Sequence, residues 1–311
     1  MQTNFYIIVP CYNEEKNIDE FIAEANSSLN KYKNFKILFI DDGSNDNTWK
    51  KIKFQCDKDE KIVGLKLTRN FGKDSAIEAG LNTLEEFSEY DFAIIIDADM
   101  QHPINKINEM IDLWKDKNKI ITTFKTNNVE NIFRKIGSDL FYYFMTNFSD
   151  AKFITKNTDF MLLDKSIVNI FNKLHEKNKS IKTFINWTGF EIKSIGIEIK
   201  KRNFGKSNYN FFNLTRTAIN AVTSFSLFPI KIVGYLGFAM SLISIILIPF
   251  FVVSNWLNFI FVSIQTLIII FNIFLTGIIL SSIGLLGIYI SRIHENSVDR
   301  PNYIIEDKKI K

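Results

Sequence analysis

The chain contains little cysteine, and this shortage excludes several classes of protein. Its 311 residues include only Cys11 and Cys56, too few for a disulfide framework or a cysteine-based zinc site. A reducing compartment such as the cytosol fits this usage. The first residues, MQTN followed by FYIIVP, lack the basic region and cleavage site of a signal peptide. The N-terminal part is therefore expected to stay in the cytoplasm.

Charge is also missing from one long stretch, since no Asp, Glu, Lys or Arg lies between Lys231 and Arg292. One membrane crossing takes roughly 20 apolar residues, so two transmembrane helices are expected, at about Ile232–Ser254 and Thr266–Ile290. The segment that connects them has no basic residue, whereas basic residues flank the pair. By the positive-inside rule both ends are cytoplasmic. The alternative is a buried hairpin in the core of a soluble protein.

The first 230 or so residues alternate between β-rich runs and helix-like segments. The expected strands are Phe5–Val9, Phe35–Ile40, Ile62–Leu67, Phe92–Ile96 and Ile120–Phe124, and the clearest helices are Asn17–Lys31 and Asp74–Phe87. Such alternation predicts a largely parallel sheet with helices on both faces. Ligands of these sheets bind beyond the carboxyl ends of the strands. The loops PCYNEE, DDGSNDNT, TRNFGKD and DADMQHP, which follow the first four strands, are therefore the candidate site.

The most informative loop is DADMQ, which contains Asp97, Asp99 and Gln101. Two carboxylates separated by one residue can share a divalent cation that bridges the phosphates of a nucleotide diphosphate. Gln101 can add an oxygen ligand, and the cation would neutralise the charge that develops on a leaving diphosphate. The alternative is that Asp99 or a neighbour caps the next helix, near Pro103.

Two further loops indicate the same kind of ligand. Asp41 and Asp42 precede a glycine that permits a tight turn, and their carboxylates can accept hydrogen bonds from a nucleobase or ribose. In RNFGK, Gly72 allows close backbone approach, while Arg69 and Lys73 supply positive charge for a diphosphate. Taken singly, a turn with capping side chains and an exposed basic turn explain these loops equally well.

Together the motifs resemble the family 2 glycosyltransferases of GT-A fold, specifically the polyprenyl-phosphate branch with bactoprenol glucosyltransferases and dolichol-phosphate mannose synthases. The matching segments are VPCYNEE, IDDGSND, RNFGK, DADMQHP, TDFMLLD, RNFGKSNY, SFSLFP, LGIYISRIHE and DRPNY. The resemblance implies an α/β fold, in which a GT-A, Rossmann-like, mostly parallel sheet domain precedes a two-helix transmembrane hairpin. The expected parts are a cytoplasmic catalytic domain (1–208), a juxtamembrane interfacial helix (209–229), two transmembrane helices (230–291) and a cytoplasmic tail (292–311).

The motifs and the resemblance also imply roles for single residues. Nucleotide-sugar binding is expected of Pro10, Tyr12, Glu14, Asp41, Asp42, Gly72, Lys73 and Asp97, and binding of Mg²⁺ or Mn²⁺ of Asp97, Asp99 and Gln101. The acceptor phosphate is expected at Lys125, Arg134, Ser138, Arg202 and Lys206. The chain departs from the family at Asn208, where relatives usually carry lysine, and at Thr158, where many carry glycine.

The segment Ile132–Phe148 gives the acceptor assignment a physical basis. It mixes Arg134 and Lys135 with many aromatic residues, a composition typical of a helix at the level of lipid headgroups. Such a helix can draw an anionic lipid head toward the site. A core helix with two solvated cations is the alternative.

The acceptor chemistry bears on the choice of catalytic residues. A phosphate monoester has a second pKa of about 6, so its oxygen can attack a sugar without strong help from a base. The resemblance implies one displacement with inversion. Asp99 is the catalytic candidate at the metal, and Asp159 is a candidate for orienting the acceptor or acting as a base, with a purely structural role as the alternative. His102 is expected to transfer no proton.

The prediction is therefore inverting transfer of a hexose, glucose first, from a UDP-sugar to undecaprenyl or another polyprenyl phosphate, for glycosylation of the cell envelope. The protein is expected in the plasma membrane, with no nucleic-acid partner. N-acetylhexosamine, mannose, modified pentoses and a homo-oligomer stay open. A membrane-tethered nucleotide-binding scaffold without turnover is the alternative of another class. The sequence has no Q-x-x-R-W motif, which argues against a processive polysaccharide synthase. The uncharged membrane block argues against a sugar translocase. The first strand is not followed by G-x-G-x-x-G, which argues against a dinucleotide oxidoreductase.

Overall fold

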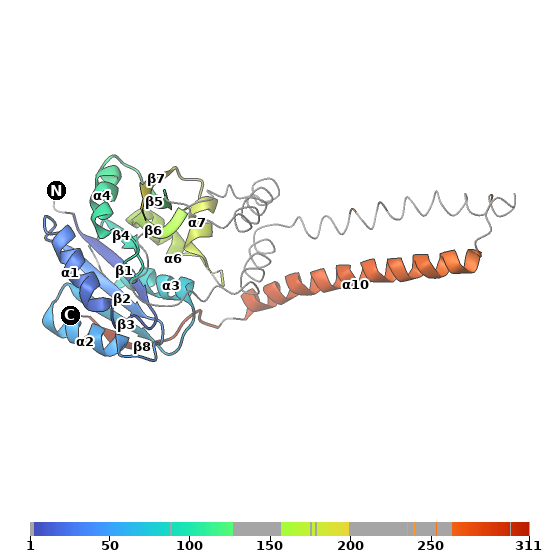
Figure 1. Ribbon diagram of the computed structural model, residues 1–311, viewed down its shortest axis with the longest axis horizontal. Helices are drawn as coiled ribbons and strands as arrows, with labels where there is room; N and C mark the ends of the chain where they lie inside the picture. Colours follow the sequence, from blue (N-terminus) through green and yellow to red (C-terminus); the bar gives the residue numbers. More distant parts are fainter. Residues whose placement is uncertain are drawn as a thin grey trace. The chain divides into compact units, whose positions relative to one another are not determined.

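The computed structural model describes residues 3–87, 89–126, 157–174, 176–177, 179–198, 263–298 and 300–310, together with Tyr235, Ala239 and Val253. The chain divides into two compact units. One consists of Met1–Ser138, Lys152–Asn208 and Arg300–Lys311, and the other of Asp139–Ala151 and Tyr209–Asp299. The first unit contains the whole described sheet, and the second contains the longest of the described helices (Figure 1).

Eight strands and seven α-helices are defined in the described residues. The strands are β1 (Phe5–Cys11), β2 (Phe35–Asp41), β3 (Ile62–Leu67), β4 (Phe92–Ile95), β5 (Ile120–Lys125), β6 (Asn157–Asp164), β7 (Ile192–Ile197) and β8 (Ile305–Lys309). The helices are α1 (Ile18–Ser28), α2 (Thr48–Lys58), α3 (Lys73–Thr83), α4 (Ile107–Lys115), α6 (Lys165–Asn172), α7 (Ile181–Trp187) and α10 (Ile264–Ser297), with 3-10 helices η1 (Leu84–Glu86) and η2 (Ile104–Lys106).

The strands form one sheet in the order β7-β5-β6-β4-β1-β2-β3-β8. Strands β4, β1, β2 and β3 are mutually parallel, whereas β6 runs antiparallel to both of its neighbours. The predicted α/β fold with a mostly parallel sheet is confirmed. Because the strand order runs in opposite directions from β1, the topological switch point lies between β1 and β4. The loops that follow these two strands therefore border the crevice in which such folds bind ligands.

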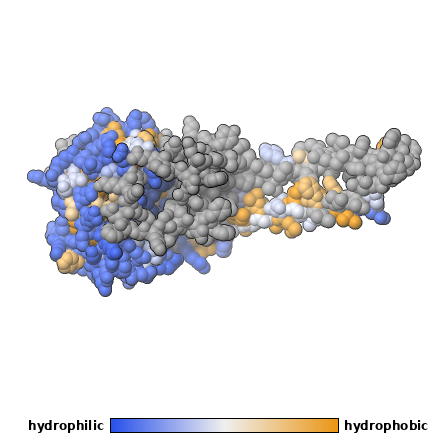
Figure 2. Space-filling model, viewed as in Figure 1, coloured by the Kyte–Doolittle hydropathy of each residue, from blue (hydrophilic) through white to orange (hydrophobic). Residues whose placement is uncertain are grey.

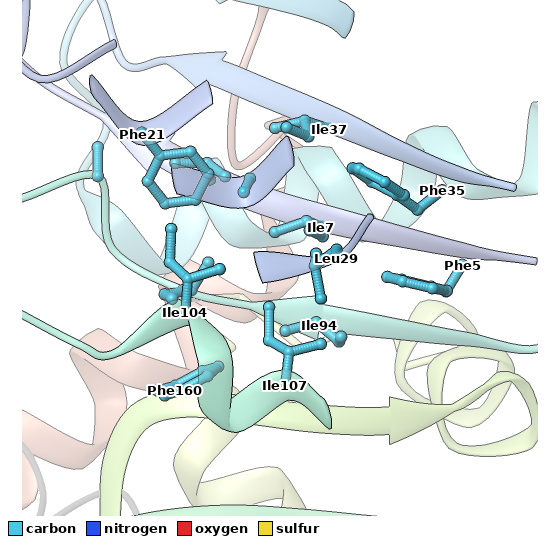
Figure 3. Close-up of a cluster of buried hydrophobic side chains, with 14 of the residues drawn as sticks. Phe5, Ile7, Phe21, Leu29, Phe35, Ile37, Ile94, Ile104, Ile107 and Phe160 are labelled. Carbon is cyan, nitrogen blue, oxygen red and sulfur yellow. The ribbon is translucent and has the colours of Figure 1, made fainter. Parts of the chain in front are cut away.

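Alternation along the strands builds a core on each face of the sheet. In β1, the side chains of Phe5, Ile7 and Val9 pack on the face covered by α1, α2 and α4. Tyr6 and Ile8 pack on the opposite face, against α3, α6 and α7. Figure 3 shows the first of these clusters. Burial of each large apolar side chain contributes about 1.5–3 kcal/mol to the stability of the fold. The two cores therefore hold the strands, and with them the loops of the candidate site, in place.

The end of the chain joins the sheet. Strand β8 pairs antiparallel with β3, and Lys66 forms a 2.7 Å ion pair with Glu306. Just before β8, the Asn302 side chain donates a 2.9 Å hydrogen bond to Glu78 of α3. The sequence places these residues in a C-terminal tail, but Ile305–Lys309 forms an edge strand of the first unit. Its charged residues give no strand pattern, so only the pairing with β3 reveals it.

Helix α10 has the length and composition of a membrane span. Its 34 residues extend over about 50 Å at the usual rise per residue. The window Phe274–Ser291 has a mean hydropathy of 1.9, and none of it is buried. Figure 2 colours many described residues of this helix as hydrophobic. The second expected crossing lies within α10, which is the one candidate span in the described part of the chain. The first expected crossing lies outside the described residues, except for Tyr235, Ala239 and Val253.

Candidate functional site

Hydrogen bonds connect the loops that follow β1 and β2. The Asn13 backbone N–H donates to Ser44 Oγ at 2.9 Å, and the Asn45 N–H donates back to Asn13 Oδ1 at 2.9 Å. The Glu14 N–H donates to Thr48 Oγ1 at 2.9 Å. Asn13 has a φ of 56°, a conformation that asparagine tolerates better than most residues. These contacts hold the PCYNEE loop in a single conformation against the second loop.

The residues expected to bind the nucleotide lie along this first loop. Pro10 is within β1, and Tyr12 follows the strand with 42% of its surface exposed. The Glu14 carboxylate accepts a 2.5 Å hydrogen bond from the Asn17 side chain. An exposed aromatic ring offers a stacking surface for a base, and a carboxylate offers hydrogen-bond acceptors for a ribose.

The two aspartates of the second loop have different surroundings. Asp41 is fully buried and its Oδ1 accepts from the Ser44 N–H at 3.1 Å. Burial raises the pKa of Asp41. Asp42 accepts hydrogen bonds from the backbone N–H groups of Phe71 (2.8 Å) and Gly72 (2.9 Å). Burial also raises the pKa of Asp42, and these two amides oppose that shift. Asp42 therefore orders the RNFGK loop, and a direct contact of Asp42 with the nucleotide stays a prediction.

Glycine is required where the second and third loops meet. Gly43 has a φ of 65°, and a Cβ on it would lie 2.3 Å from the carbonyl carbon of Arg69. Gly72 has a φ of 98°, which also suits only glycine. The Arg69 guanidinium lies over the Phe71 ring at 4.1 Å. The third loop is thus fixed by its backbone, and it ends at the first residue of α3.

Four charged side chains from separate elements meet beside these loops, and we name them the charge cluster: Lys73, Asp97, Asp159 and Lys182. Lys73 Nζ lies 2.6 Å from Asp97 Oδ1 and 2.6 Å from Asp159 Oδ2. Lys182 Nζ lies 2.7 Å from Asp159 Oδ1. Lys73 begins α3, Asp97 follows β4, Asp159 lies in β6 and Lys182 in α7. The structure therefore brings together three predicted site residues and a fourth, Lys182, which the sequence does not single out.

The charges of the cluster stabilise one another. Burial alone would raise the pKa of Asp159, but Lys73 and Lys182 outweigh it and hold that pKa well below its usual range. Burial alone would lower the pKa of Lys73, but Asp97 and Asp159 raise it above its usual range. Both groups are therefore charged at neutral pH. Asp159 is a weak proton acceptor in this arrangement.

Comparison with known proteins decides the family. The model of the family described as "Glycosyl transferase family 2" matches residues 6–174. This chain belongs to glycosyl transferase family 2. It is 30% identical to the bactoprenol glucosyl transferase of Shigella phage SfV, over 98% of this chain and 99% of that protein. It is also 30% identical to an uncharacterized glycosyltransferase of Synechocystis, over 99% of this chain and 96% of the relative.

Among solved structures, the glucosyl-3-phosphoglycerate synthase of Mycobacterium tuberculosis, in complex with Mn²⁺, UDP and phosphoglyceric acid, covers 70% of this chain. The alignment takes in 75% of that protein at 14% identity, with a TM-score of 0.47. The family assignment rests on the sequence comparisons, which extend over nearly the whole chain.

The DADMQ loop of this family 2 glycosyltransferase has the donor atoms of a divalent-metal site. Asp97 and Asp99 provide carboxylates and Gln101 an amide oxygen, which hard cations prefer. In the described part of the chain, no three His, Cys, Asp or Glu side chains gather closely enough to hold a metal. Mg²⁺ usually binds through one or two carboxylates and completes its coordination with water and substrate phosphates, so it does not require such a group. Asp99 does not cap η2, whose N-cap is Pro103.

Two buried polar side chains lie close to these residues. His102 is 7% exposed, and burial lowers its pKa, so the imidazole is neutral at pH 7. Its Nε2 lies 3.9 Å from Asp97 Oδ2, which is a contact with a neutral ring. Thr158 Oγ1 lies 2.5 Å from Thr123 Oγ1 and connects β6 to β5. Thr158 therefore forms part of the sheet.

The acceptor residues expected from the sequence are mostly untested by the structure. Lys125 is exposed at the end of β5. Outside the described residues lie Arg134, Ser138, Arg202, Lys206 and Asn208. Lys182 belongs to none of the motifs found in the sequence. The one sequence feature that could have drawn attention to it is its place in a short amphipathic helix, between the buried residues Ile181 and Phe184.

Proposed function

We propose that this protein transfers a sugar from a nucleotide-sugar to a polyprenyl phosphate at a membrane surface, with inversion and with a divalent metal. The observation that carries the proposal is the match to the Shigella phage SfV bactoprenol glucosyl transferase over almost the full length of both chains. That match takes in the sheet unit and the segment containing α10. Glucose is accordingly the first sugar to test, with UDP as its carrier.

The geometry of the first unit supports a nucleotide-sugar donor. The loops after β1 and β4 lie at the switch point of the sheet, where such folds bind nucleotides. We assign the nucleotide to Pro10, Tyr12, Glu14 and the loop that Asp42 orders. Lys73, which already neutralises one carboxylate oxygen of Asp97, provides positive charge for the diphosphate.

Asp97, Asp99 and Gln101 would hold the metal. A bound Mg²⁺ or Mn²⁺ would supply Lewis-acid stabilisation of the departing diphosphate. In the reaction, an oxygen of the lipid phosphate forms a bond to the anomeric carbon while the carbon–oxygen bond to the diphosphate breaks. The electron pair leaves with the nucleoside diphosphate. A phosphate monoester with a second pKa of about 6 is largely dianionic at neutral pH, so no proton must be removed from it.

Membrane attachment follows from α10 in this proposal. An exposed apolar helix of this length is stable in a lipid bilayer, where its backbone groups are satisfied internally. We assign both ends of the membrane-spanning block and the catalytic unit to the cytoplasmic side, because basic residues such as Lys231 and Arg292 flank the uncharged block.

The test uses the full-length protein purified in detergent, undecaprenyl phosphate, Mg²⁺ or Mn²⁺, and a panel of radiolabelled nucleotide-sugars. The expected result is label in the organic phase with one donor, which is lost when EDTA is added. Undecaprenol without its phosphate is the control acceptor. Binding of nucleotide without organic-soluble product from any donor would contradict the proposal and favour a nucleotide-binding scaffold.

A further inference from the structure

The four side chains of the charge cluster contact one another in a fixed order. Its members alternate in sign in the order Asp97, Lys73, Asp159 and Lys182, with each neighbouring pair 2.6–2.7 Å apart. The two lysines contact different oxygens of Asp159. Lys182 is therefore the end of the cluster that is farthest, in steps of contact, from the carboxylate at the metal-binding loop.

Packing fixes the position of Lys182. On either side of it in α7, Ile181, Phe184 and Ile185 are buried, and the Phe184 ring packs against the Phe171 ring at 5.2 Å. The Lys182 side chain extends from between these buried residues, and 43% of it is exposed.

A buried ion pair anchors the segment just before α7. Lys179 Nζ lies 3.0 Å from Glu78 Oε1, and both side chains are only 6% exposed. Glu78 belongs to α3, the helix that begins with Lys73. Both lysines that contact Asp159 are thus carried by elements that are joined through Glu78.

An ammonium group at this place suits the acceptor. Displacement with inversion requires the attacking oxygen to approach the anomeric carbon from the side opposite the leaving diphosphate. Asp97 marks the diphosphate side, and Lys182 is at the other end of the cluster. Lys182 forms one ion pair, with Asp159, and it also attracts the nearby Asp74 carboxylate. An ammonium group has three N–H donors, so the partly exposed side chain can also donate to a phosphate oxygen. Asp159 has one ammonium on each oxygen, so it serves to position the lysines.

We propose that Lys182 binds the phosphate monoester of the lipid acceptor and that Asp159 positions Lys182 for this contact. The inference rests on the proposed function, because it assigns a residue to the acceptor of that reaction. It adds to the predicted acceptor residues one that comes from a different part of the fold.

The first experiment is steady-state kinetics of Lys182→Met with undecaprenyl phosphate and the active nucleotide-sugar. Loss of a charge-assisted contact should raise the KM for the lipid at least about tenfold, with the KM for the nucleotide-sugar within about twofold of wild type. Lys182→Arg should restore most of the lipid affinity. The matched control is Lys193→Met, which removes an exposed lysine of β7 that pairs only with Glu191 among the described contacts.

The second experiment measures binding without turnover. Farnesyl phosphate and inorganic phosphate are titrated separately into the wild type and Lys182→Met, with UDP binding as the check on the donor side. Weaker farnesyl phosphate binding with unchanged UDP binding supports the proposal. Weaker binding of inorganic phosphate with unchanged farnesyl phosphate binding identifies a general anion site at the lysine and overturns the lipid assignment.

Other outcomes are equally decisive. An unchanged lipid KM, or an equal rise for donor and lipid, overturns the proposal. If wild type forms no glycolipid, the proposed function fails, and the farnesyl phosphate titration still tests Lys182 separately. If Lys182→Met does not fold, Lys182→Gln is measured in the same way.

Discussion

The two halves of the candidate site are built differently. The loops after β1, β2 and β3 are connected by hydrogen bonds to backbone N–H groups, such as those from Phe71 and Gly72 to Asp42. The charge cluster beside them is connected only through side chains, from Lys73 to Asp97 and Asp159 and onward to Lys182. Hydrogen bonds from backbone N–H groups hold the first half, and the attraction between oppositely charged side chains holds the second.

This difference indicates how each half can respond to a ligand. A loop held through its own backbone keeps its shape whether or not a nucleotide is bound. A partly exposed ion pair contributes little net stability, so a phosphate or a metal ion can replace one partner at low cost. We therefore expect substitutions in the loops to act through the fold, and substitutions in and next to the cluster to act through ligand affinity and turnover.

The largest effect is expected from Asp99→Asn, which alters the loop proposed to bind the metal, next to the charge cluster. If Asp99 binds the metal, its loss should reduce turnover more than about 100-fold, because stabilisation of the leaving group is lost. Turnover is measured with saturating Mg²⁺, and Asp112→Asn, a change at an exposed residue of α4, is the control. Near-normal turnover of Asp99→Asn would contradict the metal assignment.

Next in size is Gly43→Ala, which tests the half held by its backbone. The added Cβ would collide with the backbone at Arg69, so we expect a destabilisation of about 2 kcal/mol or more and weaker nucleotide binding. The control is Gly189→Ala, since Gly189 has a similar φ of 72° with open space around it. Equal melting temperatures for the two variants would show that the close approach of the loops is unimportant.

Lys73→Met tests whether charges in the cluster can be exchanged. Lys73 occupies Asp97 Oδ1, so its removal should free that carboxylate and strengthen binding of Mn²⁺ alone by roughly fivefold or more. Free Mn²⁺ is measured by electron paramagnetic resonance, with Lys106→Met as the control. Weaker Mn²⁺ binding in Lys73→Met would mean that the lysine does not compete with the metal.

The smallest effect is expected from Asp41→Asn. Burial raises the pKa of Asp41, so its charged form costs stability above its folded pKa, and this cost disappears as the carboxyl protonates at lower pH. The variant should melt at a slightly higher temperature than wild type at pH 7, because the cost of the buried charge is removed. The difference should shrink toward pH 4. A variant that melts below wild type at pH 7 would contradict this reading of the buried charge.

Much of the sheet could be predicted from the sequence. The five expected strands begin at Phe5, Phe35, Ile62, Phe92 and Ile120, and each of these residues begins a strand in the structure. These strands lie in the interior of the sheet, where apolar runs bounded by polar loops give a strong signal. Strand β8 gave no such signal, because its sequence IEDKK lies at an edge and is held by ion pairs to residues far away in the chain.

The site was predicted less completely than the sheet. Asp97 and Lys73 could be found because each lies in a strand-end loop, and the topology brings such loops together. Lys182 could not be found in this way, since its role depends on its contact with Asp159 across the fold. Asp42 shows a further limit of prediction from the sequence. Its place in a strand-end loop suggests a contact with a ligand, but in the structure both of its carboxylate oxygens accept hydrogen bonds from the RNFGK loop.

The pairing of β3 with β8 has a consequence for the order in which the protein folds. Strand β8 follows α10 in the sequence, so β3 keeps an unpaired edge while the chain between them is being synthesised. An open edge can pair with a strand of another polypeptide, and closing so long a loop is slow. The sheet therefore reaches its full width only after the ribosome has passed α10, and until then the open edge of β3 exposes the nascent chain to aggregation.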